Sequence, residues 1–175
     1  MKQKKTMRLF NILCASLIIL LFSFSTCKYG FKDTAPIPPE ITTFRVNYLE
    51  NKAQYINTQL SPQLTERLKQ KIINTTRLNQ TNDEQAHYDI GGYVSQYYTS
   101  TVGISGNDAS TNRLTVGFHL VFNNNIDDQK DFEADLTRTF DFPATQSLSE
   151  AEASLNEEIV RNIVDEIFNR IFSNW

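Results

Sequence analysis

Three basic residues are the best candidates in this sequence for binding an anionic ligand. Arg45, Arg113 and Lys130 lie in or beside stretches in which apolar and polar residues alternate. Guanidinium and ammonium groups donate charge-assisted hydrogen bonds to phosphate oxygens. The sequence therefore predicts phosphate contacts at these three positions. The alternative is that all three are ordinary solvated surface charges.

The residue types that build catalytic and metal sites do not form a recognisable group in this sequence. His87 and His119 fall in predicted strands and have no Cys, His or acidic partner at the spacing of zinc ligands. Asp127, Asp128 and Asp131 are grouped like the acidic residues of a calcium loop, but the central Gly and the closing Glu are missing. The sequence also lacks a Gly-rich phosphate loop and a nucleophile elbow. We therefore expect a non-enzymatic protein without a metal or a cofactor.

Cys27 is the candidate for covalent modification. It follows an apolar run from Leu9 to Phe24, which basic residues precede and which is too short and wrongly flanked for a membrane span. A cysteine in that place is typical of bacterial lipoproteins, in which it becomes the first residue and carries the lipid. The usual pattern has Gly, Ala or Ser directly before the cysteine, where this chain has Thr26. Residues 1–26 are therefore predicted to be a lipoprotein signal peptide. A plain signal peptide and an uncleaved anchor are the alternatives.

Residues 27–40 are predicted to form an extended tether. Three prolines, Pro36, Pro38 and Pro39, favour a stiff and extended backbone there. At roughly 3.1 Å per residue, the tether could hold the next domain up to about 40 Å from the lipid. No acidic run follows Cys27, which favours an anchor that faces the periplasm.

The charge of the chain excludes some classes of partner. Of the 17 basic residues four precede Cys27, and of the 20 acidic residues none does, so the chain from Cys27 onward carries a net charge of −7. Such a chain is not drawn to nucleic acid or to an anionic membrane surface. With one cysteine remaining, it has no internal disulfide.

The first half of the domain predicts a strand, a helix and a second strand. The first strand spans residues 41–49, and its apolar face is formed by Phe44, Val46 and Tyr48. The helix has Ser61 as its N-cap and then Pro62. Its apolar stripe follows at four-residue spacing: Leu64, Leu68 and Ile72. The second strand spans residues 86–101, in which Gly91 and Gly92 indicate a bulge or bend.

The second half of the domain predicts two more strands and a long helix. The strand over residues 113–123 alternates most clearly, with one face formed by Leu114, Val116, Phe118, Leu120 and Phe122. The next strand spans residues 132–142, and Arg138 interrupts its apolar face. Ser147 and Glu150 have the spacing of a capping box and begin the helix. Its wide apolar stripe includes Ile163 and is typical of a helix that lies across a sheet.

The predicted order of elements is β-α-β-β-β-α. A helix between the first two strands permits a parallel, right-handed crossover, and the later strands favour antiparallel hairpins. Each strand has a single apolar face, so both helices belong on the same side of the sheet. We therefore predict one α+β domain over residues 41–175, a two-layer sandwich of a four-stranded mixed sheet with two helices on one face.

The face of the sheet away from the helices is the predicted partner surface. Tyr93, Tyr97 and His119 are expected there, and exposed aromatic residues grouped on a sheet are typical of a surface that binds a partner. The alternative is that these aromatic residues are scattered over the surface without a partner.

Three segments in this order resemble the LPS-assembly lipoprotein family LptE: IPPEITTFRVNYLEN, NRLTVGFHLVFNN and EEIVRNIVDEIFNRIFSNW. The resemblance covers most of the chain from Cys27 onward. It implies a β-α-β-β-β-α fold, a lipid anchor in the outer membrane, and a place inside the lumen of the barrel protein LptD. That pair inserts lipopolysaccharide into the outer leaflet. The phosphate contacts predicted at Arg45, Arg113 and Lys130 would then be contacts with lipopolysaccharide.

From residues and resemblance together, we expect a non-enzymatic outer-membrane lipoprotein that faces the periplasm and the barrel lumen. It would plug and help assemble an LptD-like barrel and assist lipopolysaccharide insertion. One alternative is a lipoprotein that activates a periplasmic cell-wall synthase. Another is a plain periplasmic ligand-binding module.

Overall fold

The computed structural model describes residues 37–105 and 108–173, without the side chains of residues 104–110. The predicted signal peptide, Cys27 and most of the predicted tether lie outside the described residues. None of the helices in the described part of the chain has the length and apolar character needed to cross a membrane.

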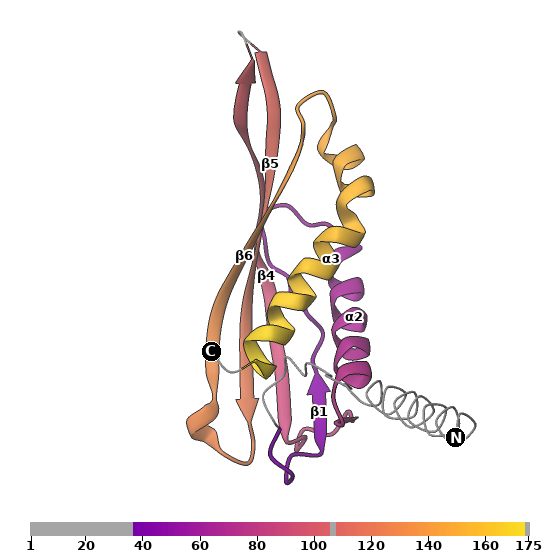
Figure 1. Cartoon of the computed structure of the whole chain (residues 1–175), viewed down its shortest axis with the longest axis vertical. Helices are drawn as coiled ribbons and strands as arrows, with labels where there is room; N and C mark the ends of the chain where they lie inside the picture. The colour runs from indigo at the N-terminus through magenta and orange to yellow at the C-terminus, as the bar shows by residue number, and fades with distance from the viewer. Residues whose placement is uncertain (1–36, 106–107, 174–175) are drawn as a thin grey trace, which may run out of the picture. The chain divides into compact units, whose positions relative to one another are not determined.

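Among the described residues, two helices and six strands build the domain, together with one short 3-10 turn, η1 (Figure 1). In chain order the elements are β1 Thr43–Val46, β2 Glu50–Asn51, α2 Leu60–Thr75, β3 Asn79–Gln80, β4 Tyr88–Ser105, β5 Asp108–Asn124, η1 Asp128–Lys130, β6 Phe132–Pro143 and α3 Leu148–Phe172.

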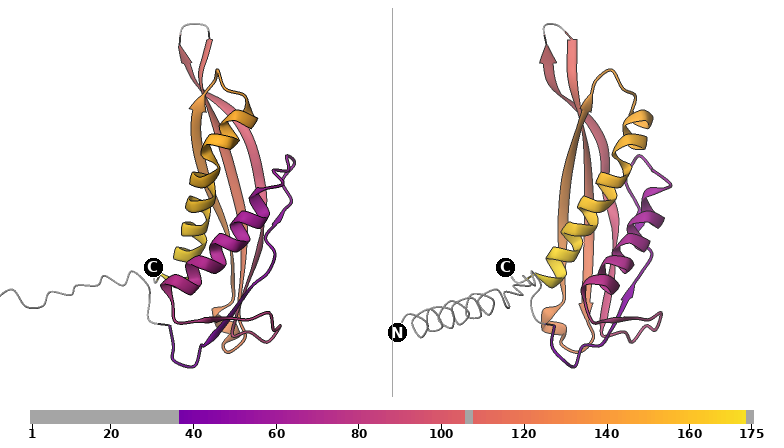
Figure 2. Two further views of the ribbon diagram at one scale, coloured as in Figure 1. Left: turned by 90° about the vertical axis from the view of Figure 1, so that its right-hand side faces the viewer. Right: turned by 45° about the vertical axis from the view of Figure 1, so that its right-hand side comes forward.

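The strands form one mixed sheet in the order β3-β1-β4-β5-β6, and β2 also pairs with β4. β1 runs parallel to β4, whereas β4, β5 and β6 are antiparallel neighbours, as the sequence predicted. Both helices lie on one face of this sheet (Figure 2). The predicted α+β class is confirmed, but the sheet has more than four strands. The additional β2 and β3 have two residues each, which is too short for a periodic pattern.

The core lies between the helices and the sheet face that they cover. On β5 the predicted apolar face is confirmed, because Leu114, Val116, Phe118 and Leu120 are all fully buried. On α2 the predicted stripe of Leu64, Leu68 and Ile72 is also fully buried. α3 begins with the predicted capping box, in which Ser147 Oγ accepts from the Glu150 N–H and the Glu150 carboxylate accepts from the Ser147 N–H. Each fully buried Leu or Ile contributes about 1.5–3 kcal/mol, so this layer stabilises the domain most.

The first strand is shorter than predicted. It ends at Val46, and Tyr48, which was placed on the buried face, is 60% exposed. Three residues separate Val46 from Glu50, whereas only two residues separate their β4 partners, Ile90 and Tyr93. The extra residue shifts the alternation by one, so Leu49 enters the core in place of Tyr48.

The first helix begins two residues earlier than predicted, and Ser61 is not its N-cap. The N-cap is Gln59, which makes no side-chain capping bond, and the helix starts at Leu60. Leu60 is 1% exposed, so its burial in the core accounts for the earlier start. Ser61 is buried as a result, and its Oγ has no hydrogen-bond partner among the described residues.

A bulge in β4 changes which tyrosine faces the core. Val94 pairs with Phe118 and Gln96 pairs with Gly117, so one residue is inserted at Ser95. After this bulge Tyr97 lies on the covered face and is 2% exposed, while Tyr98 is 52% exposed. The prediction that placed Tyr97 on the open face was therefore wrong. The cause is the one-residue insertion, which moves every later side chain to the other face.

Candidate functional site

A row of side chains crosses the open face of the sheet from the β2 segment to β6. Lys52 Nζ lies 4.6 Å from the centre of the Tyr93 ring. The Tyr93 and His119 rings are 5.1 Å apart. His119 Nδ1 lies 2.8 Å from Asp135 Oδ1, and its Nε2 lies 3.3 Å from Glu133 Oε2. Tyr93 and His119 are thus brought together on the open face, because they are directly opposite each other in the β4–β5 register.

The two carboxylates change the proton affinity of His119. The hydrogen bond to Asp135 raises the pKa of His119 above its ordinary value, and Glu133 adds to this effect. The imidazole therefore holds its proton to a higher pH than a free histidine would. Because its two nitrogens face different carboxylates, the cluster does not converge on one point. Within the part of the chain that the structure describes, no group of His, Cys, Asp and Glu could hold a metal ion.

Each basic residue that the sequence singled out is held by a neighbouring carboxylate. Arg45 on β1 binds Asp89 on β4 through two hydrogen bonds, at 2.8 and 3.0 Å. Arg113 on β5 binds Asp141 on β6 in the same two-pronged way, at 2.6 and 2.8 Å. The latter pair lowers the pKa of Asp141. Both pairs lie directly opposite in the strand register, so an anionic ligand at either arginine would compete with a carboxylate that is already bound.

Lys130 differs from the two arginines. Its side chain is 60% exposed and its ion pair is a single contact, 3.2 Å to Asp127 within the β5–β6 turn. It also lines a hollow of about 440 Å³ whose apolar wall includes Tyr88, Phe122 and Phe132. The three predicted contacts do not converge. Asp89, the partner of Arg45, lies opposite Asn123 on β5. Asn123 is ten residues along β5 from Arg113, a distance of about 34 Å at the rise of a strand.

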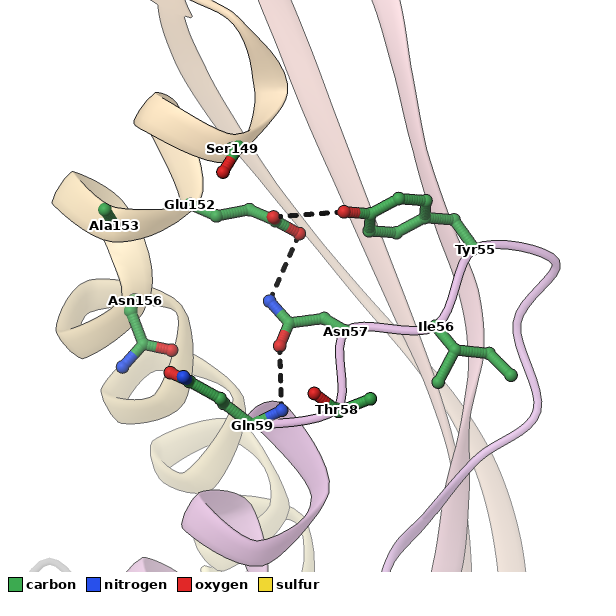
Figure 3. Close-up of a pocket in the computed structure, with 9 residues that line it drawn as sticks. All are labelled: Tyr55, Ile56, Asn57, Thr58, Gln59, Ser149, Glu152, Ala153 and Asn156. Atoms are coloured by element: carbon green, nitrogen blue, oxygen red, sulfur yellow. Dashed lines mark hydrogen bonds between the residues drawn. The ribbon is translucent and has the colours of Figure 1, made fainter.

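Tyr97 belongs to a hydrogen-bonded cluster at the N-terminal end of α3. Three other members of this cluster, Tyr55, Asn57 and Glu152, line a hollow of about 500 Å³ (Figure 3). The carboxylate of Glu152 accepts from Tyr97 at 2.8 Å, from Asn57 at 3.1 Å and from Tyr55 at 3.2 Å. The Tyr55 and Tyr97 rings stack with their centres 5.6 Å apart. Burial, with the adjacent carboxylate, raises the pKa of Tyr97. The cluster holds the 52–59 segment against α3.

A second polar cleft, of about 530 Å³, lies between β6 and the C-terminal half of α3. Arg138 reaches across it to Glu166 on α3, so this residue interrupts the apolar face of β6 by pairing with the helix. Arg170 also lines the cleft, with its guanidinium 5.7 Å from the centre of the Phe132 ring. Among the described residues, Arg170 has no carboxylate within ion-pair distance.

Comparison with known families decides to which group of proteins this domain belongs. The family model LptE, described as lipopolysaccharide-assembly, matches residues 41–171. The chain belongs to the LptE family. This match spans every helix and strand described above except the last residue of α3.

Solved structures of lipoproteins have the same fold. The domain is similar to the solution structure of uncharacterized lipoprotein B from Nitrosomonas europaea, with 16% identity and a TM-score of 0.53 over 85% of this chain and 90% of that one. It is also similar to the crystal structure of rare lipoprotein B from Shewanella oneidensis, with 12% identity and a TM-score of 0.50 over 73% of this chain and 92% of that one. A search of curated proteins finds no match.

Sequence reasoning missed several residues that organise these sites in the LptE-family domain. Asp89, Asp141 and Glu152 are the acceptors that hold Arg45, Arg113 and Tyr97, and none of them was singled out. A carboxylate opposite an arginine can be found only once the strand register is known. Glu152 follows the capping box by two residues and has no pattern that separates it from a solvated helix face.

Proposed function

We propose that the protein is a non-enzymatic outer-membrane lipoprotein that plugs and helps to assemble an LptD-like barrel and assists lipopolysaccharide insertion into the outer leaflet. The observation that carries this proposal is the LptE match over residues 41–171. The open sheet face supports a protein partner, because its arginines are already paired with carboxylates. Burying such a paired surface leaves no lone charge without a counter-ion.

The membrane anchor is a separate part of the proposal. Cys27 would carry the lipid after removal of residues 1–26, with the domain on the periplasmic side. Stable anchoring takes more than one acyl chain. Cys27→Ala should abolish palmitate incorporation in growing cells, and incorporation that persists in this variant would reject the anchor.

Among the three predicted contacts with lipopolysaccharide phosphate, Lys130 is the best placed. It is exposed, singly paired and beside an apolar hollow, which suits a ligand that has both phosphate and acyl groups. Arg113 and Arg45 are secondary candidates, because each already binds a carboxylate through two hydrogen bonds. With a net charge of −7 after Cys27, binding must depend on a few local residues and should weaken as salt increases.

Depletion of the protein tests the proposed function. Loss should leave the barrel misassembled and lipopolysaccharide stranded on the inner side. In a depleted strain, Lys130→Glu should support barrel assembly but weaken lipopolysaccharide binding. Arg161→Glu is the matched control, since Arg161 is exposed on α3 and outside the hollow. A folded barrel and normal surface lipopolysaccharide after depletion would overturn the proposal and favour an activator of a periplasmic cell-wall synthase.

A further inference from the structure

β6 is a long edge strand that has neither a bulge nor an internal proline. It has 12 residues and keeps an unbroken register with β5, which is its only partner strand in the part of the chain that the structure describes. Natural edge strands are often short, bulged or interrupted by proline, because their unpaired backbone groups attract other strands. The only proline in β6 is its last residue, Pro143. In Figure 1 no further strand lies beside it.

The backbone hydrogen bonds show which β6 residues face outward. The Asn125 N–H donates to the His87 carbonyl at 2.9 Å, and the Asn124 N–H turns the other way, to Asp131 Oδ1 at 2.6 Å. In an antiparallel sheet this alternation continues, so even-numbered residues of β5 bond to β6.

The β5–β6 register shows that the same alternation holds for the residues of β6, the edge strand. Even-numbered β5 residues are paired with even-numbered β6 residues, as Phe118 is with Leu136. The odd-numbered β6 residues therefore direct their N–H and C=O groups away from the sheet: Glu133, Asp135, Thr137, Thr139 and Asp141. Among the described residues, these outward groups have no hydrogen-bond partner.

The two sides of this edge have different charges. On the open face, the side chains of Glu133 and Asp135 are 66% and 81% exposed. On the helix side, the edge borders the cleft of about 530 Å³ that contains Arg138 and Arg170. An added strand would place alternate side chains on these two sides.

We propose that the β6 edge is a docking site for an extended segment of another protein, which adds to the sheet as a further strand. Backbone hydrogen bonds would supply affinity, and alternate side chains would supply specificity. The segment would carry Lys or Arg at alternate positions facing Glu133 and Asp135. Its intervening side chains would be acidic or polar, facing Arg170. This inference stands apart from the proposed function, because it concerns one strand edge and not the identity of the barrel.

Charge favours such a segment over a second copy of this chain. Two copies of β6 paired about Thr137 would set Glu133 of one copy opposite Asp141 of the other. Like charges directly opposite each other destabilise strand pairing. Asp141 would also need to remain bound to Arg113. The second copy is therefore an outcome for the experiment to exclude.

A synthetic peptide can test the site on the purified full chain in detergent. The probe is a fluorescein-labelled peptide as long as the exposed edge, with Lys at alternate positions and Glu, Ser and Val between them. A peptide of the same composition with its Lys residues adjacent is the control.

Two test variants of the protein, each with a matched control variant, separate the contribution of backbone hydrogen bonds from that of charge. Thr139→Pro removes an outward N–H that β5 does not use, and Thr139→Val keeps that N–H. Glu133→Lys with Asp135→Lys reverses the charge, and Glu84→Lys with Glu158→Lys is the matched control.

We expect saturable anisotropy for the alternating peptide and none for its control. Thr139→Pro and the Glu133/Asp135 reversal should each weaken binding about tenfold, while both control variants bind normally. Unchanged thermal unfolding midpoints would show that the strand still forms, since proline is tolerated at outward N–H positions of edge strands. The proposal is overturned by an alternating peptide that does not saturate, or by binding that both test variants leave unchanged. Self-association of the full chain that Thr139→Pro abolishes would also overturn it, in favour of a second copy.

Discussion

The two faces of the sheet differ in the interactions that their side chains make. The covered face is a continuous apolar layer from β5 and the helices, in which Phe118 and Ile163 are both fully buried. The open face carries opposite charges that are paired across neighbouring strands, such as Arg45 with Asp89. Stability therefore depends mainly on the covered face. The surfaces left for binding a partner are the open face and the β6 edge.

The largest expected effect is a charge introduced into the covered face. Ile163→Asp would place a carboxylate at a fully buried position on α3. Burying an unpaired charge should reduce the free energy of unfolding by about 5 kcal/mol or abolish folding. Arg161→Asp on the exposed side of the same helix should change it by less than about 1 kcal/mol. Urea unfolding followed by circular dichroism measures both, and similar losses would contradict the contrast between the faces.

The next effect concerns a close backbone approach between β4 and β5. Gly92 has φ of 147°, and a Cβ there would lie 2.3 Å from the His119 carbonyl oxygen and 2.8 Å from the Phe118 ring. Gly92→Ala should therefore cost about 2–4 kcal/mol. The neighbouring Gly91 has room, with Asn47 Nδ2 at 3.4 Å. Gly91→Ala should be neutral within about 1 kcal/mol, and a thermal unfolding midpoint lowered equally in both variants would refute this explanation.

A smaller effect is expected where a polar cluster borders the covered face. Glu152→Ala removes the acceptor of Tyr97, whose ring is 2% exposed. The buried Tyr97 O–H, left without its acceptor, should cost about 1–3 kcal/mol. Adding Tyr97→Phe to that variant should restore part of the loss, because the O–H without an acceptor is then absent. Chemical denaturation of the two single variants and the double variant measures the coupling, which should be about 1 kcal/mol. Strictly additive losses would mean that the hydrogen bond contributes nothing.

The smallest effect belongs to the open face and depends on pH. Because Asp135 and Glu133 raise the pKa of His119 in the folded state, the stabilisation is complete below the unfolded pKa and is lost as pH rises through the folded pKa. The unfolding free energy of the unaltered protein, relative to His119→Gln, should thus fall as pH rises above the ordinary histidine pKa of about 6.5. The change should be below about 1 kcal/mol. The groups that face the imidazole are Asp135, Glu133 and Tyr93, with Lys52 beyond Tyr93. A difference that grows with pH would contradict the direction of this pKa shift.

Local sequence patterns predicted most of the fold, but few of the side chains that pair with one another. Alternation was sufficient for β5, on which Leu114, Val116, Phe118 and Leu120 are fully buried, and the capping box was sufficient for the start of α3. Tyr97 was misplaced because the bulge lies at Ser95, whereas the sequence indicated a bulge or bend at Gly91 and Gly92. Arg45 and Arg113 were correctly predicted as strand residues, but their partners Asp89 and Asp141 depend on register. Register is set by pairing between distant segments, so one strand alone cannot indicate it.

Co-purification tests the proposed function most directly. The full chain should be isolated with an affinity tag from detergent-solubilised outer membranes, and its partners identified by mass spectrometry. We expect a large outer-membrane β-barrel protein in stoichiometric amount. The complex should survive Cys27→Ala, because contacts of the domain rather than the lipid would hold it. Recovery of a penicillin-binding protein without any barrel would contradict the proposed function and identify the cell-wall alternative.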